Sequence, residues 1–63
     1  MIHTPAPDDA AQIAAFLDSH TGWSAFWDKA YGVWRVAEDD PRSDLYAENT
    51  DARTVIAYAT THS

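Results

Sequence analysis

Cysteine is absent from this 63-residue chain, glycine occurs only twice, and four basic residues stand against ten acidic ones. Without cysteine, neither a disulfide nor a thiolate metal site can support the fold. A domain this short buries a modest share of its surface, so it needs dense aromatic packing or a partner subunit. Three tryptophans, three tyrosines and two phenylalanines are consistent with the first route.

The scarcity of basic residues leaves a formal net charge of −6, which bears on the class of partner. Such a chain is poorly suited to neutralise the phosphates of nucleic acid or of an anionic membrane, and it suits a basic protein instead. No window approaches the roughly 18 apolar residues of a membrane span. The opening residues MIHTP lack the basic start and apolar run of a signal peptide. We therefore expect a cytoplasmic protein, and the alanine-rich composition suggests a bacterial or phage origin.

Hydrophobic spacing and turn residues predict five elements within one domain spanning residues 1–63. Apolar residues recur at helical spacing over about 7–19 and again over about 51–61, where Thr50 is the expected N-cap. Short β-prone segments at about 23–28, 33–37 and 44–48 are separated by turn sequences, DKAYG and EDDPRSD. The prediction is an α+β domain of order α-β-β-β-α.

The segment WSAFWDKAYGVWRV carries all three tryptophans and admits two interpretations. Its bulky apolar residues also recur at helical spacing, so residues 23–31 could form a helix instead of a strand. A β-hairpin is the preferred interpretation, because Asp28 before the turn and Gly32 at its end suit a loop whose last residue takes a positive φ.

In this hairpin Trp27 lies opposite Trp34, and strand alternation turns the tryptophans toward one face. The third strand fits best with Leu45 beside Val36 and Ala47 beside Trp34, since this register keeps apolar side chains together. We expect both the N-terminal and the C-terminal helix to pack on that face of a three-stranded antiparallel sheet.

The opposite face of the sheet is the candidate partner-binding surface. Among the side chains that alternation places there, five are the candidate contact residues: Phe26, Asp28, Arg35, Tyr46 and Glu48. Aromatic residues and arginine are enriched at binding hot spots, and the two acids would supply a charged rim. The competing interpretation is ordinary cross-strand packing on an open sheet.

No sequence pattern indicates catalysis or metal binding. The three histidines, His3, His20 and His62, share no ligand spacing, and no serine or threonine lies in a motif with a base. A glycine-rich phosphate loop is also missing. We expect no enzyme activity, no metal and no cofactor.

The stretch WSAFWDKAYGVWRVAED resembles the central tryptophan-rich strands of the MbtH-like proteins, which are small partners of nonribosomal peptide synthetases. That family also pairs a three-stranded sheet with a helix. This chain lacks the family's proline-spaced tryptophan signature and has an additional N-terminal helix, so no membership is assigned.

The sequence favours a small, acidic, non-enzymatic protein-binding module of an accessory or regulatory kind. One alternative is a DNA-mimic inhibitor of the anti-restriction or anti-CRISPR type, whose carboxylates would occupy a basic nucleic-acid site. Another is a self-associating structural subunit, of which a homodimer is the simplest form.

Overall fold

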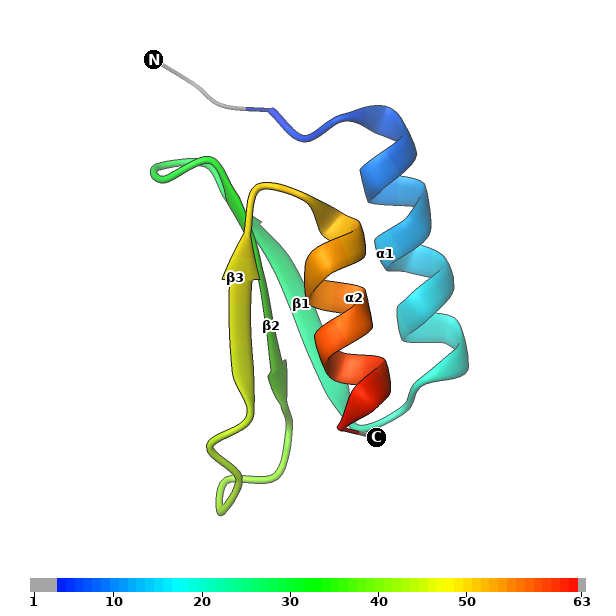
Figure 1. The fold of residues 1–63 in the computed structure, drawn as a ribbon, viewed down its shortest axis with the longest axis vertical. Helices are drawn as coiled ribbons and strands as arrows, with labels where there is room; N and C mark the ends of the chain where they lie inside the picture. The colour runs from blue at the N-terminus through cyan, green and yellow to red at the C-terminus, as the bar shows by residue number, and fades with distance from the viewer. Residues whose placement is uncertain (1–3, 63) are drawn as a thin grey trace.

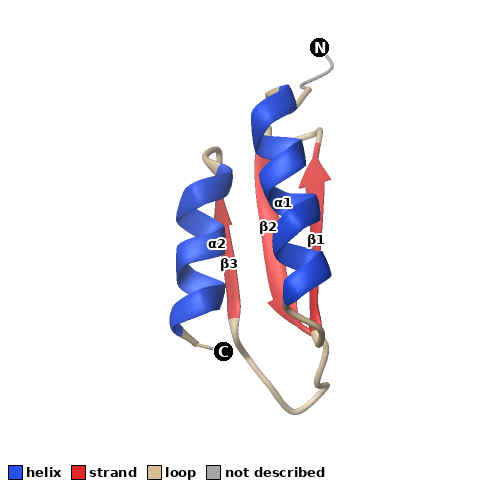
Figure 2. Ribbon diagram, turned by 90° about the vertical axis from the view of Figure 1, so that its right-hand side faces the viewer, coloured by secondary structure: helices blue, strands red, loops and turns tan. Residues whose placement is uncertain are grey.

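The computed structural model describes residues 4–62 and contains five elements in the predicted order. These are α1 (Pro7–Ser19), β1 (Trp23–Asp28), β2 (Val33–Glu38), β3 (Tyr46–Asn49) and α2 (Ala52–Thr61). Both helices lie on one side of the sheet, so the molecule has two layers (Figures 1 and 2). The predicted α+β architecture is confirmed, and the helical alternative for residues 23–31 is wrong because Trp23–Asp28 is a strand.

The β1–β2 hairpin has the predicted register. Trp27 lies opposite Trp34, and Phe26 lies opposite Arg35. The backbone N–H of Gly32 donates to the Asp28 carbonyl at an N···O distance of 2.7 Å, and Gly32 has a φ of +68°. Only glycine takes this conformation without strain, so Gly32 closes the hairpin as predicted.

The register predicted for the third strand is wrong by two residues. Ala47, rather than Leu45, lies opposite Val36. The shift is set by the turn before β3, where the backbone N–H of Glu38 donates to the Leu45 carbonyl at 3.3 Å. A displacement of two residues preserves the alternation, so every side chain of β3 keeps its predicted face. It also sets Glu48 directly across from Arg35.

The helices begin at different kinds of residue. α1 begins at Pro7, whose missing N–H costs nothing in a first turn, and Asp8 and Asp9 follow where the helix dipole favours negative charge. α2 is capped by Asp51, whose carboxylate accepts the backbone N–H of Arg53 at 3.0 Å. The prediction of Thr50 as the cap is therefore wrong by one residue.

The core lies between the sheet and the two helices and is entirely apolar. Its buried residues come from every element except β3: Ile13, Phe16, Trp23, Trp34, Val36, Ala52, Val55 and Ala59. The tryptophans thus line the inner face of the sheet, although Trp27 is only half-buried. Neither helix of residues 4–62 has the length and apolarity that a membrane span requires.

Candidate functional site

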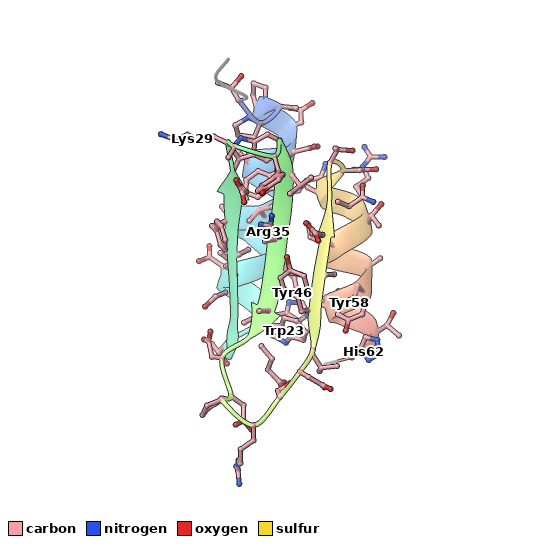
Figure 3. All side chains as sticks on the ribbon, turned by 90° about the vertical axis from the view of Figure 1, so that its left-hand side faces the viewer. Trp23, Lys29, Arg35, Tyr46, Tyr58 and His62 are labelled. Carbon is pink, nitrogen blue, oxygen red and sulfur yellow. The ribbon has the colours of Figure 1, made fainter. Side chains whose placement is uncertain are left out.

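The five residues predicted for the partner-binding surface lie on the outer face of the sheet, which we define as the face turned away from α1 and α2. Figure 3 looks onto this face, with Arg35 at its centre and Tyr46 beside it. No helix covers it (Figure 1). The pairing of the strands brings the five together, since Phe26 and Glu48 lie opposite Arg35 on its two sides.

Arg35 joins all three strands through its guanidinium group. Its Nε donates to Asp28 Oδ2 of β1 at 2.9 Å, and its Nη1 donates to Glu48 Oε2 of β3 at 2.8 Å. The same Nη1 also donates to the hydroxyl oxygen of Tyr46. Opposite charges across neighbouring strands stabilise a sheet, and these bonds fix the guanidinium in one orientation.

A sixth residue, Tyr31, belongs to this site and was missed by the sequence analysis. The Arg35 Cζ atom lies 5.5 Å from the centroid of the Tyr31 ring, within the range of a cation–π contact. Tyr31 lies in the hairpin loop between β1 and β2, where the alternation of strand side chains does not apply. The sequence therefore carries no signal that places its ring on the outer face.

Asp28 connects the hairpin loop to the arginine. Its Oδ1 accepts the backbone N–H groups of Ala30 and Tyr31 at 3.0 and 3.3 Å, while its Oδ2 accepts from Arg35. The hydrogen bond from Arg35 lowers the pKa of the Asp28 carboxyl below its ordinary value of 3.8, and the two loop N–H groups add to that effect. Donating this hydrogen bond to Asp28 in turn raises the pKa of Arg35.

We call the six residues together the Arg35 cluster: Phe26, Asp28, Tyr31, Arg35, Tyr46 and Glu48. Within residues 4–62, the large hydrophobic side chains that are exposed are Phe26, Tyr31 and Tyr46, at 57%, 75% and 44%. All three belong to the cluster. Exposed aromatic area is therefore concentrated around one fixed arginine, rather than scattered singly over the surface as is usual.

The charges of the cluster do not cancel. One guanidinium faces two carboxylates, which leaves the cluster with one net negative charge. The Arg35 side chain is 19% exposed and that of Glu48 is 48% exposed, so the acid is the more accessible to a partner. The arrangement can offer aromatic faces and hydrogen-bond acceptors to a cationic group.

Other polar groups lie away from this face. At the C-terminal end of α1, His20 stacks on Phe16 with ring centroids 4.6 Å apart, and its Nδ1 lies 2.9 Å from Ser19 Oγ. In the part of the chain that the structure describes, no group of three or more histidine, aspartate or glutamate side chains could hold a metal ion. Over the same residues, 4–62, the surface has no detectable pocket.

No protein-family model matches this chain, and no curated protein or solved structure shows significant similarity to it. The resemblance of the hairpin segment to MbtH-like proteins gains no support from these comparisons.

Proposed function

We propose that this protein is a non-enzymatic protein-binding module whose contact surface is the Arg35 cluster. The observation that carries the proposal is the concentration of Phe26, Tyr31 and Tyr46 around Arg35 on a face that no helix covers. Aromatic residues and arginine supply most of the binding energy at many interfaces. Since the hydrogen bonds of Arg35 hold it in place, little side-chain entropy would be lost on binding.

The charge of the cluster favours a basic partner. Asp28 and Glu48 outweigh the single guanidinium, and the whole chain carries a net charge of −6. A partner surface bearing lysine or arginine would be attracted over several ångströms, and its cations could pack on the Tyr31 and Phe26 rings. Association would then slow and weaken as the ionic strength rises.

The experiment that tests the proposal is site-specific photo-crosslinking in the cells that express the chain. A photoreactive phenylalanine analogue is placed at Tyr31, the most exposed aromatic residue of the cluster. The matched control carries the same analogue at Ala11, which is exposed on α1. We expect one protein, different from this chain, to crosslink from position 31 and not from position 11.

Equal crosslinking from both positions, or no crosslink from position 31, would contradict the proposal. A crosslink from position 31 to another copy of this chain alone would assign the outer face to self-association instead. The captured protein is then purified, because affinity for the purified pair, rather than capture, decides whether the contact is specific.

A further inference from the structure

The two edges of the sheet differ in how their backbone groups are covered. The hydrogen bond from Glu38 N–H to Leu45 shows that residues 45, 47 and 49 bond to β2, so Tyr46 and Glu48 turn their backbone groups to the free edge of β3. There the N–H of Tyr46 donates to the hydroxyl of Tyr58 at 3.2 Å. β3 is also short, and α2 lies alongside it (Figure 2).

At Trp23 and Ala25, the β1 edge has no such cover within residues 4–62. The hydrogen bond from Asp39 N–H to Gly22 sets the alternation, so Ser24 and Phe26 bond to β2 while Trp23 and Ala25 turn their backbone groups outward. The described residues supply no hydrogen bond to the outward groups of Trp23 and Ala25. In Figure 3, β1 forms the outer boundary of the sheet on the side opposite α2.

The composition of β1 does not protect this edge either. Proteins commonly block an open edge with proline, lysine, a bulge or a very short strand. β1 is six residues long and reads WSAFWD, with its single charge at the last position. A regular strand of this kind, with uncharged aromatic residues and with outward N–H and C=O groups at Trp23 and Ala25 that the described residues leave unbonded, is a template for another strand.

We infer that a second copy of this chain covers the edge, by antiparallel pairing of β1 with β1 around Trp23 and Ala25. A strand with outward N–H and C=O groups at both residues is self-complementary under a twofold axis. The paired segment is uncharged from Trp23 to Trp27, so it offers nothing that would select a basic strand. Pairing would continue both sheets into one and would leave the outer face of each copy open to a partner.

Two measurements on the purified chain test the dimer. Sedimentation over a concentration series gives the association state, and amide hydrogen exchange followed residue by residue locates the interface. We expect dimers to form, with exchange of the Trp23 and Ala25 amides slowing as concentration rises. Each copy carries a charge of −6, so the two copies repel each other. Raising the ionic strength from about 0.01 M to about 0.15 M shortens the screening length from about 30 to about 8 Å. The repulsion is then weaker, and the dimer should become more stable. Binding of a basic protein at the outer face would respond in the opposite direction, so the two proposals can fail separately.

Ala25→Pro removes the outward N–H without touching a bond to β2, and proline is tolerated at such edge positions. We expect it to weaken dimerisation at least about tenfold, while the control Ala25→Val, which keeps the N–H, remains dimeric. If the proline variant fails to fold, exchange in the wild-type chain decides. A chain that stays monomeric, a dimer with unprotected Trp23 and Ala25 amides, or protection that is independent of concentration would each overturn the inference.

Discussion

Trp34 lies on the central strand with only 6% of its surface exposed, and its ring packs edge-on against Trp27 at a centroid distance of 5.3 Å. Its indole Nε1 is buried and has no hydrogen-bond partner within residues 4–62. An unpaired buried donor costs about 1–3 kcal/mol. The ring therefore stabilises the fold through its packing alone, and this packing must outweigh the penalty of burying the N–H group.

We expect Trp34→Ala to leave the protein largely unfolded at room temperature. Truncating a buried aromatic residue costs about 3–5 kcal/mol, which rivals the whole stability of a small domain. Trp34→Phe should remain folded, because it keeps an aromatic ring and removes the unpaired donor. Thermal melts followed by circular dichroism check both variants, and a cooperative Trp34→Ala melt near that of the wild type would contradict the assignment of Trp34 to the core.

Gly32 is a second position where one residue controls the fold. Its φ of +68° lies in the left-handed region, which costs a side-chain-bearing residue about 1–2 kcal/mol. We expect Gly32→Ala to lose about that much unfolding free energy, as measured by urea denaturation. Ala30→Ser in the same exposed loop is the control and should change stability little; an equal loss in both would show that the backbone conformation of Gly32 is not the cause.

Among the elements, α2 depends on its cap. Asp51 accepts the Arg53 N–H at 3.0 Å, whereas Thr50 lies one residue before the cap. Asp51→Ala should therefore lower the unfolding free energy by about 1 kcal/mol, and the matched variant Thr50→Ala should have little effect. Urea titrations of the two variants give the comparison, and the reverse ranking would restore Thr50 as the cap.

The hairpin should respond to acid through Asp28. Because the folded-state pKa of this carboxyl is lowered by Arg35, its contribution to stability is present above the ordinary value of 3.8 and is lost as the pH falls through the lowered pKa. Melting temperatures measured from neutral pH downward should fall more in the wild type than in Asp28→Asn. Asp18→Asn, which removes an acid without an ion pair in the described chain, should keep the wild-type fall.

The elements also show how far the sequence predicts this structure. The β1–β2 register could be read in advance because its short loop, from Lys29 to Gly32, allows few geometries. The longer turn before β3 does not restrict the register to one choice, and apolar alternation is unchanged by a shift of two residues. Two contacts accompany the observed β2–β3 register: the hydrogen bond from Glu38 to Leu45 and the one from Arg35 to Glu48. Each joins residues that come close together only once the turn between β2 and β3 has folded.

At the scale of the whole molecule, the placement of both helices on one face decides which residues are available to partners. The inner face takes the tryptophans, and the outer face keeps the Arg35 cluster (Figures 1 and 3). The five candidate residues could be assigned to this face from alternation alone. The hydrogen bonds that hold Arg35 and the contribution of Tyr31 could not, since they depend on how the hairpin loop folds back over β2.

The central claim, that the Arg35 cluster is a protein-binding surface, is tested most directly by calorimetric titration of the purified partner captured at position 31. The variants are Phe26→Ala and Tyr31→Ala, because both side chains are exposed and neither takes part in the hydrogen bonds of the Arg35 guanidinium. We predict that each raises the dissociation constant about tenfold, or about 1.4 kcal/mol, with an unchanged melting temperature, while Ala11→Ser binds like the wild type. Wild-type affinity in both aromatic variants would contradict the account.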